Sequence, residues 1–111
     1  MDNKSNFRRG SVELLILKLL SEKDYYGYEL SQTIKTRSSN ILDIPVGSLY
    51  PALYKLIDQE YIVDYKKQVG KRLVRVYYNI QDKGIERLEL LLEDYYKTNR
   101  GIQGVLDYKK D

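Results

Sequence analysis

The segment 45-PVGSLYPALYKLI-57 decides the fold of this chain. Its apolar residues recur with the period of an α-helix and form one stripe, made of Leu49, Leu53, Leu56 and Ile57. Because a proline in a helix interior costs about 3 kcal/mol, we expect the helix to begin near Val46 or Gly47, which keeps Pro51 close to the first turn. The opposite side of this helix then carries Ser48, Pro51, Tyr54, Lys55 and Asp58, with Tyr50 at the border.

Two helices are predicted ahead of this segment. Residues 11–20 are apolar almost all round a helix, and Ser11 is the predicted N-cap. Such a helix needs two neighbours. One is the core of its own domain, and the other is either a partner subunit or a further part of the same chain. A shorter amphipathic helix is predicted from near Gly27 to Arg37, with Leu30 and Ile34 facing inward.

A β-hairpin is predicted after the proline-containing helix. Residues 61–68 and 73–80 are rich in Val, Ile and Tyr, and residues 69–72 supply the turn. From residue 62 to residue 80 the hairpin carries one acidic residue, Asp64, and five cations, which are Lys66, Lys67, Lys71, Arg72 and Arg75. A cationic hairpin suits contact with DNA phosphates, although lysines also protect a solvated sheet edge from aggregation. The charge alone leaves both interpretations open.

The last part of the chain is predicted to be a helix from Gln81 to about Asn99. Its apolar positions alternate in steps of three and four, and the seam continues through Ile85, Leu88, Leu92, Tyr95, Asn99, Ile102 and Leu106. This heptad spacing is typical of one helix packing along another. Gly101 and Gly104 each weaken a helix by about 1 kcal/mol, so we expect fraying or a break near residue 100.

Composition excludes several classes of function. The chain has 111 residues, a net charge of +3, no cysteine and no histidine. The absence of both residue types removes disulfides, thiolate and imidazole metal ligands, and the commonest catalytic nucleophile and base pairs. We therefore expect neither an enzyme nor a cofactor. The longest apolar run is about half of what a membrane span needs, and we expect a cytoplasmic protein.

The order of elements predicts an α+β fold, mainly α with a small β-hairpin. Three short helices and a basic hairpin form the layout of a winged helix-turn-helix domain, predicted for residues 1–80, and residues 81–111 form a dimerisation helix and tail. In this layout the third helix enters the major groove of double-stranded DNA. The predicted contacts on that helix are Ser48, Tyr50, Pro51, Tyr54 and Lys55. Alternatively, Tyr50 and Tyr54 pack beneath the hairpin.

Four motifs resemble the PadR family of bacterial transcriptional regulators. They are RGSVELLIL at residues 9–17, YGYEL at 26–30, GSLYPAL at 47–53, and VYYNI at 76–80 followed by DKG at 82–84. The resemblance implies a homodimeric repressor that binds a pseudo-palindromic operator. Many members carry Ser or Thr just before the glycine of the third helix, where this chain has Pro45-Val46.

The resemblance also implies a dimer held by the first and last helices. The predicted interface residues are Val12, Leu15, Ile16, Leu19, Ile85, Leu88, Leu92 and Tyr95. Some family members sense small aromatic molecules, and the candidates for lining such a cavity here are Tyr25, Tyr26, Tyr28, Tyr95 and Tyr96. Tyrosines at these spacings more often fill a core or an interface, so the sequence assigns no ligand. A protein-interaction module, whose basic hairpin meets an acidic partner, is the rival function.

Overall fold

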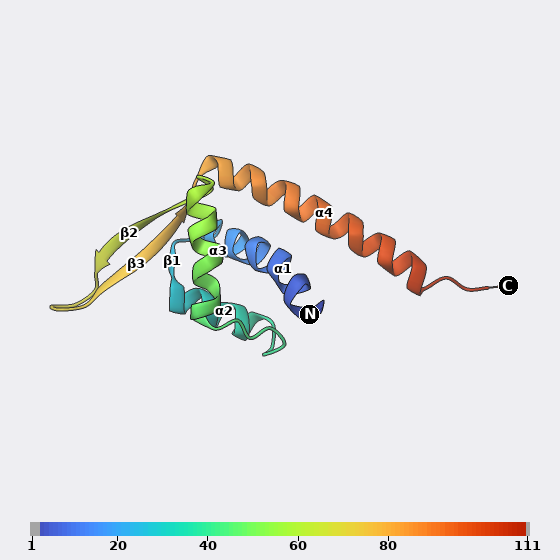
Figure 1. Ribbon diagram of the computed structural model, residues 1–111, viewed down its shortest axis with the longest axis horizontal. Helices are drawn as coiled ribbons and strands as arrows, with labels where there is room; N and C mark the ends of the chain where they lie inside the picture. The colour runs from blue at the N-terminus through green and yellow to red at the C-terminus, as the bar shows by residue number, and fades with distance from the viewer. Residues whose placement is uncertain (1–2, 111) are drawn as a thin grey trace.

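The computed structural model describes the backbone of residues 3–110 and the side chains of residues 11–110. It has the predicted α+β architecture, with four helices and a small antiparallel sheet (Figure 1). The elements in chain order are α1 (Asn3–Leu20), β1 (Tyr25–Tyr26), α2 (Gly27–Arg37), α3 (Val46–Asp58), β2 (Ile62–Gln68), β3 (Val74–Ile80) and α4 (Asp82–Leu106).

The core lies between α1, α2, α3 and one face of the sheet. The predicted stripe of α3 is confirmed, because Leu49, Leu53 and Leu56 are buried and Ile57 is partly buried against them. The largest completely enclosed side chains come from all of these elements, and they are Ile16, Leu17, Leu30, Leu49, Leu53, Leu56 and Ile62. α3 begins at Val46, as its proline spacing predicts.

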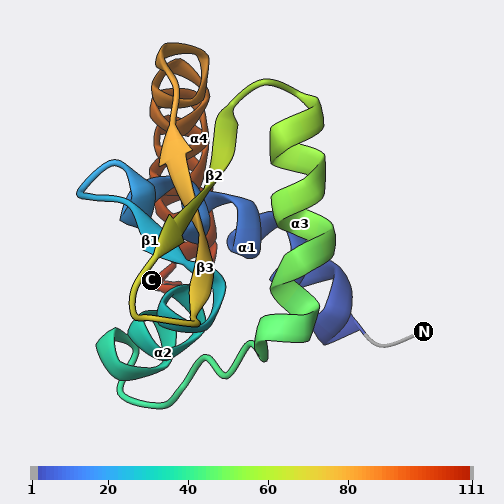
Figure 2. The same cartoon turned by 90° about the vertical axis from the view of Figure 1, so that its left-hand side faces the viewer.

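The sheet has three strands in the order β1-β3-β2 (Figure 2). The hairpin of β2 and β3 agrees with the prediction, whereas the two-residue strand β1 is too short to leave a periodic signal in the sequence. β1 pairs with β3 through Tyr25 opposite Tyr78 and Tyr26 opposite Tyr77. Because strand residues alternate between faces, Tyr25 and Tyr78 lie on the core face and the other two tyrosines lie on the outer face.

Two predicted helix ends are wrong. α1 begins at Asn3 and not at Ser11, so Ser11 lies inside the helix and is not its N-cap. α4 runs to Leu106 without the break expected near residue 100. In both cases glycines lie inside the helix, and the cost of about 1 kcal/mol for each is small enough for the flanking turns to overcome.

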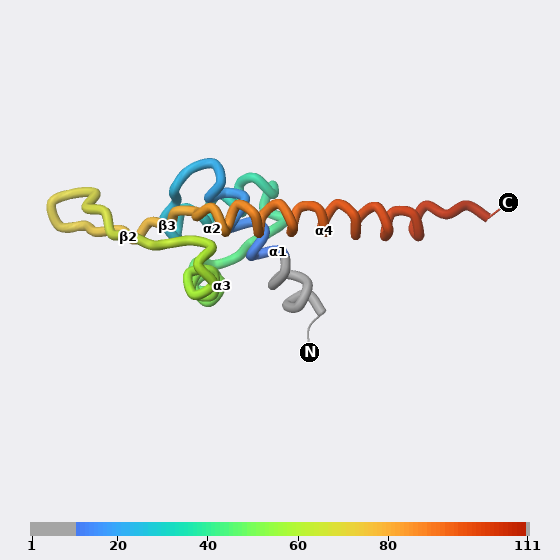
Figure 3. Tube along the Cα trace, turned by 90° about the horizontal axis from the view of Figure 1, so that it is seen from above, coloured from blue at the N-terminus to red at the C-terminus, as the bar shows by residue number. Residues whose placement is uncertain are grey.

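The first turns of α4 pack tightly on the domain. The N–H of Gln81 donates to the carbonyl oxygen of Tyr61 at 2.9 Å, and Gly84 is buried against the same backbone. One turn later, Nε of Arg87 lies 2.8 Å from a carboxylate oxygen of Glu13 on α1. Beyond this region α4 leaves the body as a straight rod, which gives the molecule a longest dimension of 69 Å (Figure 3). No helix within residues 3–110 is both long and apolar enough to span a membrane.

Candidate nucleic-acid interface

The N-terminal ends of α2 and α3 meet at one corner of the domain. A β-carbon at Gly27 would lie 3.2 Å from Cγ2 of Val46, so the missing side chain allows the two helix starts to approach closely. The N-caps are Tyr26 and Pro45, and neither makes a side-chain capping hydrogen bond. Free backbone N–H groups and two helix dipoles therefore favour an anion such as a phosphate at this corner.

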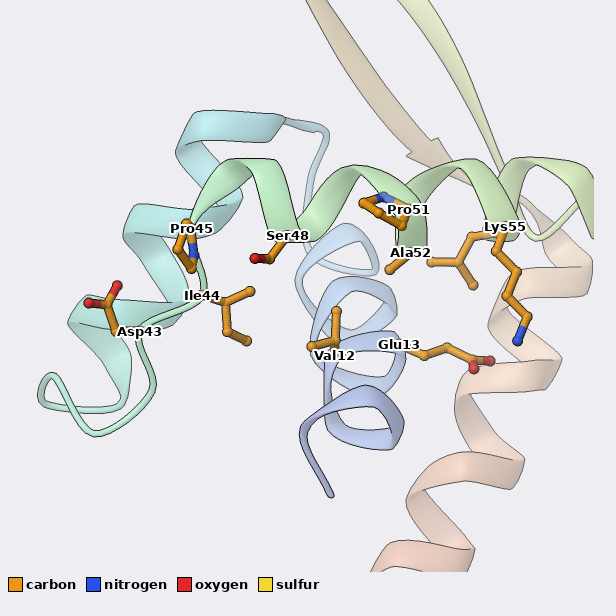
Figure 4. A pocket seen from close by; sticks show the side chains of 10 residues that line it. Val12, Glu13, Asp43, Ile44, Pro45, Ser48, Pro51, Ala52 and Lys55 are labelled. Atoms are coloured by element: carbon orange, nitrogen blue, oxygen red, sulfur yellow. The ribbon is translucent and has the colours of Figure 1, made fainter. Parts of the chain in front are cut away.

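The predicted contact residues of α3 are all exposed, but they divide between two sides of the helix. Tyr50 and Tyr54 face the hairpin, and their rings stack with centroids 6.0 Å apart. On the other side, Ser48, Pro51 and Lys55 line a hollow of about 540 Å³ against α1 and the loop before α3 (Figure 4). The exposed helix thus presents tyrosines toward the wing and small or cationic residues away from it.

A cleft of about 440 Å³ separates α3 from the β2-β3 hairpin, which we call the wing. Five tyrosines contribute to its lining, and they are Tyr26, Tyr28, Tyr50, Tyr54 and Tyr78. Burial raises the pKa of Tyr78 to about 12, with further electrostatic contributions from Tyr50, Tyr54 and Asp64. Tyr28, Tyr50 and Tyr54 are the exposed tyrosines of this cleft, and phenol hydroxyl groups suit hydrogen bonding to phosphate oxygens.

Tyr28 is a candidate contact that the sequence analysis did not place at the DNA surface. It is 59% exposed in the first turn of α2 and lines the cleft opposite Tyr50 and Tyr54. The sequence signal for this role is the place of Tyr28 directly after Gly27, in the first turn of the helix.

The five predicted phosphate-binding cations of the wing do not form one patch. Lys71 and Arg72 are exposed at the tip, between the two strands. Lys66 shares the α3-facing side with Asp64, because alternate residues of β2 point the same way. Lys67 and Arg75 face outward, where they lie 5.3 Å and 4.3 Å from the ring centroids of Tyr77 and Tyr26. Of these five cations, Lys67 and Arg75 thus lie over tyrosine rings, whereas Lys71 and Arg72 lie beyond the ends of both strands.

The eight predicted interface residues differ in how deeply they are buried in the single chain. Four belong to the core of the single chain, and they are Val12, Ile16, Leu19 and Leu88. Their burial removes most of their surface from contact with a second copy. Leu15 and Leu92 are half-buried, while Ile85 and Tyr95 are exposed on α4.

The tyrosines considered for an aromatic ligand do not line one cavity in the single chain. Tyr25 is buried in the core, Tyr26 packs on Tyr77, and Tyr28 lies at the cleft. Tyr95 and Tyr96 contact each other on the distal half of α4, far from β1 (Figure 1).

Comparison with known proteins agrees with this arrangement. The model of the PadR-like family of transcriptional regulators matches residues 16–90. A transcriptional regulator from Clostridium thermocellum shares 34% identity, with a TM-score of 0.81 over 88% of this chain and 95% of that chain. A PadR-like regulator from Bacillus cereus shares 29% identity, with a TM-score of 0.78 over 91% and 96% of the two chains.

The structure of Bacillus subtilis PadR in complex with operator DNA is also similar. It shares 26% identity, with a TM-score of 0.68 over 74% of this chain and 47% of that longer chain. The winged arrangement of α2, α3 and the hairpin lies within the residues that the family model matches. The chain therefore belongs to the PadR-like family of transcriptional regulators.

Proposed function

We propose that this chain is a sequence-specific DNA-binding repressor. Two copies bind a pseudo-palindromic operator, each with α3 in the major groove and the wing on the phosphate backbone. The observation that carries the proposal is that the start of α3, which has no side-chain cap, the tyrosine-lined cleft and the cationic wing tip are all exposed. The operator complex of the Bacillus subtilis relative supports this assignment.

These exposed residues have different tasks. The start of α3 is exposed and carries Gly47 and Ser48, whose small side chains let the backbone approach the duplex closely. Tyr54 and Lys55 lie on the next turn and reach base edges, and Lys71 and Arg72 contact phosphates. Base contacts give sequence discrimination, whereas phosphate contacts supply affinity that depends on salt.

The distal half of α4 supports the homodimer. This half extends past the body, and its large apolar side chains are exposed, namely Tyr95, Tyr96, Ile102, Val105 and Leu106. An antiparallel pair of α4 helices places Ile85 near the partner's Leu106 and Leu92 near the partner's Asn99. The charges agree with this direction, because the proximal half is acidic at Glu86, Glu89, Glu93 and Asp94 and the distal half is basic at Lys97 and Arg100.

Repression follows from occupancy of the operator, which blocks access of other proteins to the promoter. We include in the proposal that a small aromatic molecule relieves repression by binding between the two subunits. Tyr95 and Tyr96 support this part, because both rings are exposed on the half of α4 that the dimer covers.

The proposal is tested by incubating the purified chain with fragmented genomic DNA and sequencing the bound fragments. Recovered sites should share an inverted repeat, and a reporter carrying that site should be less active when the chain is present. For a dimer that makes about 6 to 10 phosphate contacts, affinity should fall by about 10³ to 10⁵ between 50 and 200 mM salt. Failure to bind any duplex at low salt would favour the rival protein-interaction module.

A further inference from the structure

The outer face of the sheet carries a layer of side chains that the proposed DNA contacts leave unused. Tyr65 of β2 stacks on Tyr77 of β3 with ring centroids 5.8 Å apart, and Tyr77 meets Tyr26 of β1 edge-on at 5.5 Å. The outward-facing wing cations, Lys67 and Arg75, lie over the rings of Tyr77 and Tyr26. The layer therefore spans all three strands, and at its edge Tyr26 and Arg75 also contribute to the lining of the cleft.

Asp24 lies beside this layer, immediately before β1. One of its carboxylate oxygens accepts a hydrogen bond from the Tyr65 hydroxyl at 2.6 Å, and the other accepts one from the Asn79 side-chain amide at 2.8 Å. The Asn79 oxygen in turn accepts a hydrogen bond from the side chain of Gln81, the N-cap of α4, at 2.8 Å. One carboxylate thus connects both wing strands to the end of the α1-β1 loop.

The wing has few other connections to the body. Beyond Ile62, every residue of β2 is exposed, and the core face of β3 is well buried only at Tyr78. Backbone pairing with β1 involves only two residues. A long hairpin that is supported only at its base can change its angle to the body at small cost, so contacts made near the base determine where the tip lies.

We propose that Asp24 is a positioning residue that fixes the angle of the wing, and through it the place where Lys71 and Arg72 meet the DNA backbone. This inference rests on the proposed DNA-binding function and goes beyond it, because Asp24 is not one of the proposed DNA contacts. Hydrogen bonds to Asp24 from Tyr65 of β2 and Asn79 of β3 hold the strands together at the point where the wing leaves the body.

The direction of the change in DNA affinity distinguishes a positioning role of Asp24 from a purely electrostatic one. Asp24→Ala removes a negative charge. Electrostatics alone would therefore predict less repulsion from the DNA phosphates and stronger binding. Positioning predicts the opposite result, a loss of affinity of about fivefold, because the hydrogen bonds of Asp24 no longer fix the wing. Asp82→Ala is the charge-matched control, since Asp82 is exposed in the first turn of α4 and should leave affinity unchanged or slightly higher.

The decisive experiment is a thermodynamic cycle on the full-length chain. Affinity for a selected operator duplex is measured for the parent, Asp24→Ala, the tip variant Lys71→Ala/Arg72→Ala, and the combination of all three substitutions. If Asp24 acts through the tip, its substitution weakens the parent about fivefold but has little further effect once the tip cations are gone. An equal loss in both backgrounds, or no loss in the parent, would overturn the proposal.

Tyr65→Phe provides a second, milder variant, because it removes one hydrogen bond to Asp24 and keeps the stacked ring. Its loss of affinity should be smaller and should again depend on the presence of the tip cations. If the losses caused by Tyr65→Phe and by the tip variant simply add, positioning is contradicted. Thermal unfolding of every variant verifies that binding is measured on folded protein. If the parent chain binds no duplex, the proposed function itself fails, which differs from a parent that binds and an Asp24 variant that binds equally well.

Discussion

The backbone carbonyl of Tyr61 occupies the space where a side chain at residue 84 would begin. A β-carbon at Gly84 would overlap that oxygen and would also lie 2.9 Å from Cγ1 of Ile80. Glycine is therefore required for α4 to start where it does, directly against the beginning of β2. The contact fixes the direction of the long helix relative to the winged domain.

Gly84→Ala should lower the free energy of unfolding by about 2–3 kcal/mol, because backbone atoms must move to admit a methyl group. Chemical denaturation measured by circular dichroism checks this value. Gly104→Ala is the matched control, since a β-carbon there meets nothing within 4 Å. It should leave stability unchanged or raise it by about 0.5–1 kcal/mol through helix propensity. Equal effects of the two substitutions would contradict the steric explanation.

Lys71→Ala and Arg72→Ala should weaken binding to all duplex sequences to a similar degree. Both side chains are exposed at the wing tip, where they suit phosphate contact and carry no sequence information. Each substitution should also reduce the salt dependence of the binding constant by about one unit of slope. Fluorescence anisotropy at several salt concentrations, with operator and scrambled duplexes, measures both quantities. A loss confined to the operator would assign base readout to the wing.

Tyr54→Ala or Lys55→Ala should instead change the discrimination between operators. These residues are exposed on α3, and loss of a base contact costs about 1 to 3 kcal/mol at the position that it reads. Competition binding against a library of single-base operator variants measures this change. A uniform loss across the library, equal to that of the wing-tip variants, would show that α3 contacts only phosphates.

Stability should fall as the pH rises through the range of tyrosine ionisation. Burial raises the pKa of Tyr78 to about 12, whereas an unfolded tyrosine titrates near about 10. Below about pH 10 both states hold the proton and this contribution to stability is complete. Between the two values only the unfolded state loses the proton, so Tyr78 lowers the free energy of unfolding by up to about 1.4 kcal/mol per pH unit.

Thermal unfolding of Tyr78→Phe across this alkaline range should show a shallower decline than the parent. Tyr108→Phe serves as the control, because Tyr108 is 78% exposed beyond the end of α4. Its curve should follow that of the parent. A parent whose stability does not change between about pH 10 and 12 would contradict the assigned role of burial.

Ile102→Glu should weaken the proposed dimer by at least about tenfold, because it places a charge in the apolar seam of α4. Sedimentation equilibrium measures the dissociation constant. Gln103→Glu adds the same charge at the neighbouring residue, outside the seam, and should have a much smaller effect. A parent that sediments as a monomer at micromolar concentration would exclude the α4 pair.

Much of the fold follows from local patterns in the sequence. The stripe of α3 and the start of that helix next to Pro45 were predictable, because a regular apolar period and a proline act within a few residues. The hairpin strands were predictable for the same reason. The resemblance of four short motifs to PadR regulators predicted the family, and with it a transcriptional regulator and not an enzyme.

Other features depend on contacts between distant parts of the chain. β1 exists only because Tyr25 and Tyr26 pair with β3, more than fifty residues later. The division of the wing cations between two faces follows from the strand register, and Asp24 meets Asn79 across 55 residues. The burial of Val12, Ile16 and Leu19 within the protomer likewise required the packing of α1 against its neighbours, because a helix that is apolar all round does not show which side faces a partner.

The uninterrupted α4 has a consequence for how such regulators diversify. Each residue inserted between Arg87 and Tyr95 would turn the distal half by about 100° and move it by about 1.5 Å. In the proposed dimer, one extra residue would thus misalign the paired helices, whereas seven would almost restore the orientation and move the two winged domains apart by about 10 Å. For that dimer, length changes of whole heptads in this segment are a simple evolutionary route to operators with a different distance between their half-sites.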